Sequence, residues 1–287
     1  MAVSTAPEGV INTYGTLDQL KARVGITGAS SDSSLWYALH GASRGIDGWC
    51  GRQFFALLAV RLFDVDDPTG SYVPDLVSVA SLREDADRDR VFEVTRTEAD
   101  HLLYPLNATP LADWGRPHTR VVADPNGPLP SFTVGRSAVQ VDGEWGFRSV
   151  FTDSGADVGG GGVSAGATTL VVTNGALFTP GQTVRAGAEQ MFVRQVSGND
   201  LTVARGVNGT VAASQAAATD LNVFRYPPEV VEAALLLAAR YWKRKDSAYG
   251  PVAGVGSQGA VRVVAGMDPD IEEMLSPFRK LRIGAAG

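Results

Sequence analysis

Two amphipathic helical patterns lie within residues 17–50. The first runs from Leu17 to Val24, where Thr16 and Gln19 form a capping-box pattern and Gly25 follows the last apolar position. The second begins after a serine-rich stretch, with Asp32 as the predicted N-cap, and is expected to make about five turns. Its apolar residues recur every three or four positions: Leu35, Leu39, Ala42, Ile46 and Trp49.

Small residues form an adjoining stripe on the second helix. After Ala38, glycines recur at steps of three and four positions. A glycine inside a helix costs about 1 kcal/mol relative to alanine, so three on one stripe indicate that another backbone approaches closely. We therefore predict helix close-packing at Gly41, Gly45 and Gly48.

From residue 54 to about residue 151 the apolar period changes to two, which predicts β-strands. Clusters of Asp, Asn, Gly and Pro predict the turns between them. The predicted strands cover 56–63, 76–82, 91–94, 120–122 and 138–141, and the predicted turns lie at 66–70, 85–89, 126–128 and 142–143.

Residues 158–163, with four consecutive glycines, have the composition of a flexible linker. Short alternating segments and turn dipeptides then continue to residue 225. This pattern predicts a small all-β unit of about 65 residues, a modest sandwich or barrel inserted into the chain.

The helical period returns at Pro227 and Pro228, where a proline suits the first helical position. Acidic residues occupy the first turn of this helix and basic residues the last, which suits the helix dipole. A last helix is expected to follow Asp268. The sequence therefore predicts an α+β fold, in which the N- and C-terminal segments form a small α-helical frame and large antiparallel β insertions lie between them. The expected parts are 1–58 (helical), 59–157 (β), 158–225 (all-β insertion) and 226–287 (helical).

Composition narrows the class of protein. The single cysteine excludes an internal disulfide, and the first residues lack the basic and apolar regions of a secretory signal. The most apolar helical run is about ten residues, short of the roughly 20 that span a bilayer.

The net charge is −6, and residues 60–160 hold nine arginines, no lysine and seventeen acidic residues. Such a surface repels phosphate, which argues against sequence-specific DNA binding.

A hydrolase motif is present only as a pattern. Residues Gly41 to Gly45 match G-x-S-x-G, and an acid followed by His101 or His118 would complete a triad by chain order. A nucleophile elbow requires a strand before the serine, whereas Ser43 lies within a continuous helical pattern. His40 and Ser43 are better explained as polar positions at the edge of that helix.

Other chemical motifs also lack their structural context. The G-x-G-x-x-G at 254–259 has neither the preceding strand nor the following helix of a dinucleotide site. The aspartate clusters at 64–67 and 85–89 lack the EF-hand glycine and glutamate spacing, so they are interpreted as acidic hairpin tips. Three histidines and one cysteine do not make a usual structural zinc site. We therefore predict no catalytic residue, cofactor site or metal site.

The order of elements, a helical frame interrupted by β insertions, resembles head-to-tail connector (adaptor) proteins of long-tailed double-stranded DNA bacteriophages. The N-terminal resemblance lies in the sequence around Leu17 to Lys21, the polar break at 30–34 and the helix that ends at 46–54. The C-terminal resemblance lies in 227–240, 243–250 and 268–282. Together these segments cover about 110 residues, and the middle of this chain is longer than the short β connection of smaller relatives.

The resemblance implies a non-enzymatic structural protein of the virion neck, assembled in the host cytoplasm. It implies a homo-oligomeric ring of about twelve subunits below the portal protein, with a stopper or tail-completion protein attached below. Packaged DNA would pass through the lumen without sequence-specific contact, and no membrane would be involved.

The resemblance also assigns the portal contact to residues 247–287. A short helix with an apolar stripe behind a tether suits helix-in-groove binding. The implied anchors are Ile271, Met274, Leu275, Phe278 and Leu281. The alternative is that this stripe packs on its own subunit.

Two other functions stay open on the sequence. One is a serine hydrolase that uses Ser43, which an esterase assay of Ser43→Ala would test. The other is a virion surface module whose all-β insertion binds a host glycan. Protease cleavage near residues 159–162 would then release a folded fragment that binds cells.

Overall fold

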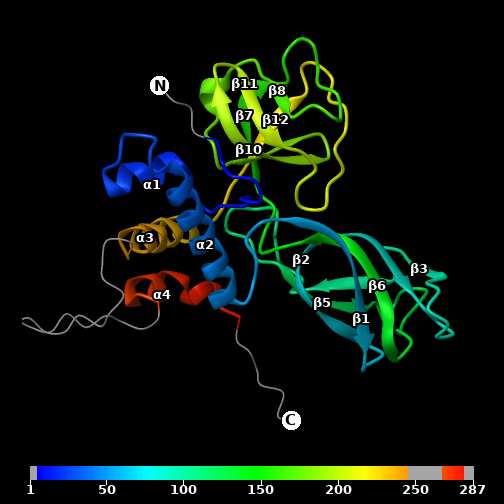
Figure 1. Ribbon diagram of the computed structural model, residues 1–287. Helices are drawn as coiled ribbons and strands as arrows, with labels where there is room; N and C mark the ends of the chain where they lie inside the picture. Colours follow the sequence, from blue (N-terminus) through cyan, green and yellow to red (C-terminus); the bar gives the residue numbers. More distant parts are fainter. Residues whose placement is uncertain (1–4, 245–266, 281–287) are drawn as a thin grey trace, which may run out of the picture.

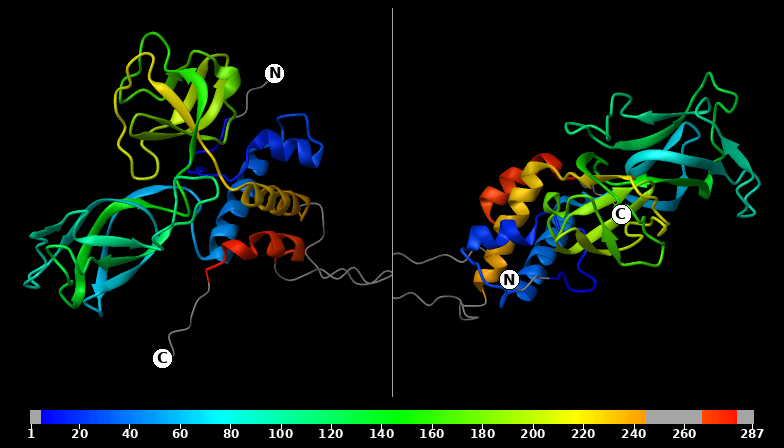
Figure 2. Two further views of the ribbon diagram at one scale, coloured as in Figure 1. Left: turned by 180° about the vertical axis from the view of Figure 1, so that it is seen from behind. Right: turned by 90° about the horizontal axis from the view of Figure 1, so that it is seen from above.

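The computed structural model describes residues 5–244 and 267–280, and it divides into three parts (Figure 1). A helical frame forms one side of the molecule, and two β units extend from it as separate lobes (Figure 2). Most of the regular structure is antiparallel sheet, so the predicted α+β class is confirmed.

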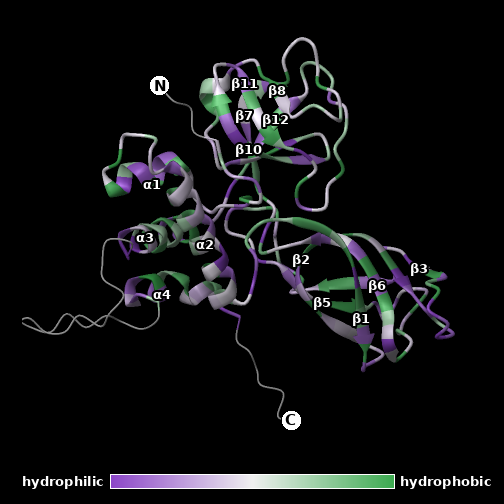
Figure 3. Ribbon diagram, in the orientation of Figure 1, coloured by the Kyte–Doolittle hydropathy of each residue, from purple (hydrophilic) through white to green (hydrophobic). Residues whose placement is uncertain are grey.

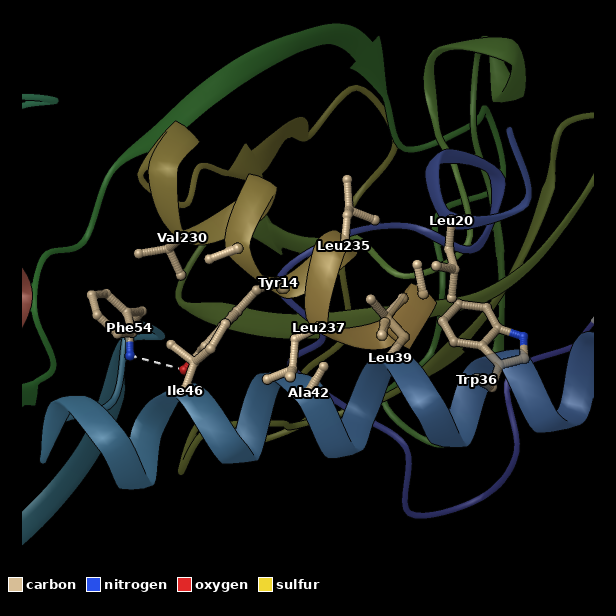
Figure 4. Packing of buried hydrophobic residues seen from close by; sticks show 14 of the residues in the cluster. Tyr14, Leu20, Trp36, Leu39, Ala42, Ile46, Phe54, Val230, Leu235 and Leu237 are labelled. Atoms are coloured by element: carbon tan, nitrogen blue, oxygen red, sulfur yellow. Dashed lines mark hydrogen bonds between the residues drawn. The ribbon is translucent and has the colours of Figure 1, made fainter. Parts of the chain in front are cut away.

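The helical frame combines both ends of the described chain. Its core also receives Phe192 and Val207 from the second β unit, which fixes that unit to the frame. Figure 4 shows the packing between the two longest helices. The frame consists of α1 (Leu17–Val24), α2 (Asp32–Cys50), α3 (Pro228–Arg244), α4 (Pro269–Leu275) and the single turn η2 (Ser276–Phe278).

The ends of α1 are as predicted, whereas the predicted N-cap of α2 is wrong by one residue. Thr16 and Gln19 make the complete capping box, and Gly25 closes α1 in the left-handed conformation. The N-cap of α2 is Ser31, not Asp32 as predicted. Asp32 is instead the first residue of that helix. Its carboxylate pairs with Lys21 at 2.8 Å, and this ion pair joins α1 to α2.

The first β unit, called the sheet unit below, is one antiparallel sheet with strand order β1-β6-β2-β5-β4 and β3 added on β2. Its apolar face encloses a core that includes Trp145 and Leu76. The predicted turn at 142–143 is wrong, since both residues lie within β6. A Cβ on Gly143 would meet the Ser78 carbonyl oxygen at 2.4 Å, so glycine here permits close strand approach rather than a turn. The strands are β1 (Leu57–Val65), β2 (Gly70–Glu84), β3 (Val94–Arg96), β4 (His101–Tyr104), β5 (His118–Ala123) and β6 (Gly135–Trp145).

The second β unit, called the barrel unit, has the strand order β7-β12-β9-β10-β11-β8. A bridge between Val158 and Val172 joins the ends of its outer strands, so the sheet closes into a small barrel around its own apolar core. Its elements are β7 (Phe151–Asp157), β8 (Thr169–Val171), η1 (Gly175–Leu177), β9 (Thr183–Ala186), β10 (Glu189–Ser197), β11 (Asp200–Ala204) and β12 (Asp220–Phe224).

The boundary predicted at residue 158 is wrong by one strand. Because β7 pairs with β12, the barrel unit begins at Phe151. The predicted flexible linker is also wrong: Gly159 donates its N–H to the Val171 carbonyl at 2.7 Å, and Gly162 donates to Gly159 at 2.9 Å. Val163 is buried in the barrel core. These glycines form a fixed loop of the barrel, since their amides have barrel partners.

The loop at Asn208 and Gly209 contacts all three parts of the molecule. Asn208 accepts a hydrogen bond from the Leu58 N–H at 2.9 Å through its carbonyl oxygen. Its side chain exchanges hydrogen bonds with the side chain of Asn12 in the N-terminal segment. The following Gly209 has φ of +74° and lies directly against the Leu58 backbone. The positions of the two β units therefore depend on this loop.

Candidate functional site

The structure removes the basis for a nucleophilic serine. Ser43 lies in the middle of α2 and is fully buried, and its Oγ donates to the Leu39 carbonyl at 2.8 Å and accepts from the Tyr14 N–H at 3.0 Å. His101 and His118 lie on strands β4 and β5 of the sheet unit. Since Ser43 does not follow a strand, the nucleophile-elbow hypothesis is wrong, and its hydroxyl serves to fix the N-terminal segment.

That segment is held by a buried polar cluster that sequence reasoning did not identify. The Tyr14 hydroxyl donates to the Asp47 carboxylate and accepts from the Phe54 N–H at 3.0 Å. Arg44 lies 3.2 Å from Asp47 and 5.3 Å from the centre of the Tyr14 ring. Burial raises the pKa of Asp47 to about 6, although Arg44 and the Tyr14 hydrogen bond oppose the rise.

The raised pKa of Asp47 makes stability depend on pH. The folded-state pKa of about 6 exceeds the ordinary aspartate pKa of 3.8, so the folded state binds the proton more tightly and Asp47 contributes less stability as pH rises from about 4 to 6. The difference corresponds to about 3 kcal/mol. We expect the stability of Asp47→Asn, relative to that of wild type, to be higher at pH 7 than at pH 4. Urea unfolding of both proteins at both pH values measures this difference. Equal differences at the two pH values would contradict this assignment, because other carboxylates are common to both proteins.

The glycine stripe of α2 meets side chains of α3 at two of its three positions, and no backbone atom of α3 lies within 4 Å of an ideal Cβ at either. Gly41 lies 3.9 Å from the Tyr241 ring, measured from an ideal Cβ, and Gly45 lies 3.4 Å from the Tyr241 hydroxyl. These two glycines therefore face α3 at ordinary van der Waals distance, and their close-packing role stays a prediction. The position of Gly48 is open, with no described heavy atom within 4 Å of an ideal Cβ.

The residues predicted to dock on a portal lie partly in the protein's own core. Ile271 and Leu275 are buried in the helical frame, and Met274 and Phe278 are half-buried at its edge. The Phe278 ring packs on Phe147 at 5.3 Å between centres. Leu281 and residues 247–266 are outside the described residues. In this structure the stripe thus packs on its own subunit, and docking on a portal stays a prediction.

A cavity of about 540 Å³ lies where the helical frame meets the sheet unit. We call it the junction cavity. Arginines enter it from three segments: Arg52 after α2, Arg116 before β5 and Arg148 after β6. Its apolar wall includes Phe147, Phe278, the exposed Trp114 and the prolines Pro105, Pro117, Pro227, Pro228 and Pro277.

The arginines of the junction cavity are only partly compensated. Arg52 Nε lies 3.4 Å from Asp75, which also pairs with Lys280 at 2.9 Å. Burial lowers the pKa of Arg52, Asp75 opposes this, and Arg116 adds a smaller lowering effect because the two cations repel. Arg148 is 3% exposed, and its Nε has no hydrogen-bond partner among the described residues. The cavity is therefore suited to an anionic group.

The acidic loop between β2 and β3 contains four carboxylates close enough to share a cation: Asp85, Asp87, Asp89 and Glu93. Their oxygens already organise the loop. Asp85 accepts the Arg88 and Arg90 N–H groups at 2.7 and 2.8 Å. The loop is thus a hydrogen-bonded acidic turn between β2 and β3.

No protein-family model matches the chain, and no curated protein is similar to it. A solved structure described as "Neck of empty GTA particle computed with C6 symmetry" contains a chain that is similar to this one, with 12% identity and a TM-score of 0.44. The similarity covers 99% of this chain and 98% of that chain. No described helix of this protein is both long enough and apolar enough to cross a bilayer.

Proposed function

We propose that the protein is a structural component of a phage-type virion neck, the ring-shaped adaptor that joins the portal to the tail. The observation that supports this most is the helical frame. The segments that resemble connector proteins lie at opposite ends of the sequence, yet residues from 17–54 and 227–278 share one apolar core. The two β units are insertions in that frame, and they are longer than the short β connection of the smaller connector proteins.

The distribution of charge supports a passage for DNA. Residues 60–160, which include most of the sheet unit and strand β7 of the barrel unit, carry most of the acidic residues and no lysine. Figure 3 shows hydrophilic positions at the end of the sheet unit farthest from the helices. Such a surface does not retain phosphate backbones, so DNA would slide past it rather than bind.

The partners follow from the same proposal. The portal protein would bind the frame, a stopper or tail-completion protein would bind the opposite side, and assembly would take place in the host cytoplasm. Electron microscopy of the purified protein mixed with the portal of the same particle tests this. Rings attached to the portal are expected, and a protein that stays monomeric beside the portal would overturn the proposal.

Portal docking by the last helix has its own test. Met274 is half-buried on the predicted stripe, whereas the adjacent Glu273 is exposed. We expect Met274→Asp to weaken portal binding about tenfold or more, since interface anchors of this kind dominate affinity. Glu273→Ala is the matched control and is expected to bind as wild type. Thermal unfolding of both variants verifies the frame, and equal portal affinities would show that this stripe does not dock.

A further inference from the structure

The junction cavity is a positive site in an acidic protein. The chain has a net charge of −6, but Arg52, Arg116 and Arg148 all line this cavity. Arg148 is held by the Asp113 backbone carbonyl, while the Asp113 carboxylate lies 3.8 Å away and is largely exposed. A buried guanidinium with an unpaired Nε is costly unless an acceptor reaches it. Asp113 and Glu229 also line the cavity, so three arginines face two carboxylates, and the Arg148 Nε is still without an acceptor among the described residues.

The opposite end of the sheet unit carries the complementary charge. The turn at 64–69, between β1 and β2, is called the distal turn, and it exposes Asp64, Asp66 and Asp67. Tyr72 beside it is 79% exposed. The Asp66 carboxylate makes no hydrogen bond or ion pair with any described residue, and Asp67 reaches Arg120 only at 3.9 Å. The distal turn is therefore an acidic tip with an exposed aromatic side chain.

The cavity and the tip cannot meet within one chain. Leu57 at the start of β1 pairs with Trp145, close to Phe147 and Arg148 of the cavity, and Val65 at the end of β1 lies within the distal turn. Nine residues of strand separate the two sites by roughly 27 Å. In Figure 1 the start of β1 lies beside the helical frame, and the end of β1 lies at the side of the sheet unit away from the frame.

We propose that the distal turn of one copy of this chain seats in the junction cavity of the next copy. The aspartates of the turn would supply acceptors to Arg116 and Arg148, while Trp114 and Tyr72, both more than three-quarters exposed, would be covered at the rim. A head-to-tail contact uses two different surfaces, so it propagates from copy to copy and closes into a ring when the rotation allows. The inference rests on the proposed function for its ring, but it specifies which surfaces form the contact.

The test is a pair of charge reversals on exposed residues. Arg116→Glu damages the cavity and Asp66→Lys damages the tip, and neither residue contributes to a described core. Arg83→Glu and Asp200→Lys are the matched controls, with the same charge changes at exposed positions away from both sites. Sedimentation equilibrium of the full chain measures association.

We expect each reversal to weaken self-association about tenfold or more, the controls to associate as wild type, and added salt to weaken the wild-type contact. In a mixture of the two reversals the intact tip of Arg116→Glu meets the intact cavity of Asp66→Lys, so a dimer should form in the mixture although neither variant associates alone. Wild type that is monomeric at about 1 mM, or a mixture that forms no dimer, would overturn the contact. Portal-bound rings made by both reversal variants would reject this contact alone, whereas absence of rings from wild type would reject the proposed function.

Discussion

Glu189→Ala is expected to destabilise the protein by about 3–5 kcal/mol, because it leaves a cation without its partner inside the barrel unit. Both carboxylate oxygens of Glu189 bind Arg205 at 2.7 Å, and the same carboxylate accepts the Gly206 and Ala213 N–H groups. Burial acts to raise the pKa of Glu189, yet these donors outweigh it and hold the pKa below its usual value. Urea unfolding followed by circular dichroism measures the loss.

The control for Glu189 is Asp200→Ala on the exposed edge of the same unit, which should change stability by no more than about 0.5 kcal/mol. The pH dependence of the Glu189 contribution to stability should be opposite in sign to that of Asp47. Since the folded-state pKa of Glu189 is lowered, its contribution is present above the unfolded-state pKa and is lost as pH falls through the folded-state value. A Glu189→Ala variant as stable as wild type at neutral pH would show that the pair does not support the barrel.

Gly209→Ala is expected to cost well above 2 kcal/mol, because both its conformation and its surroundings exclude a Cβ. Its φ is +74°, and an ideal Cβ would lie 2.0 Å from the Leu58 carbonyl oxygen. Gly198 has φ of +60° but no described heavy atom within 4 Å of an ideal Cβ, so Gly198→Ala is the matched control. It should cost only about 1–2 kcal/mol, for the left-handed conformation alone.

The difference between these two alanine variants, measured by the same urea unfolding, isolates the backbone contact between the barrel loop and β1. Equal losses would mean that the loop moves away from Leu58 without consequence. In that case the two β units would not be held in position by this contact.

The helices were predictable because their signals are local. The capping box at Thr16 and the left-handed Gly25 act within one turn, and the apolar period of α2 defines its buried face without reference to other segments. Strand β7 was not predictable in this way. Its sequence FTDSGAD is polar and contains a glycine, and it becomes a strand because β12 pairs with it in the barrel.

The candidate sites were less predictable than the fold. The junction cavity brings together Arg52, Arg116 and Arg148, which are separated by 64 and 32 positions and share no motif. The Tyr14 cluster likewise depends on tertiary contact with Asp47. The glycine run at 159–162 illustrates the opposite error, since composition indicated flexibility while hydrogen bonds to Val171 and within the loop fix its place.

The only sulfhydryl of the chain lies beneath the last helix. Cys50 is buried in the frame core with Ile271 and Leu275, and its backbone carbonyl accepts the Lys280 N–H at 2.9 Å. Burial raises the pKa of the Cys50 thiol to about 12. A thiol kept protonated and covered reacts slowly with alkylating reagents. If the terminal segment leaves its own frame to engage another protein, that sulfur becomes accessible, so the rate of iodoacetamide labelling would report the undocking of α4 without any added probe.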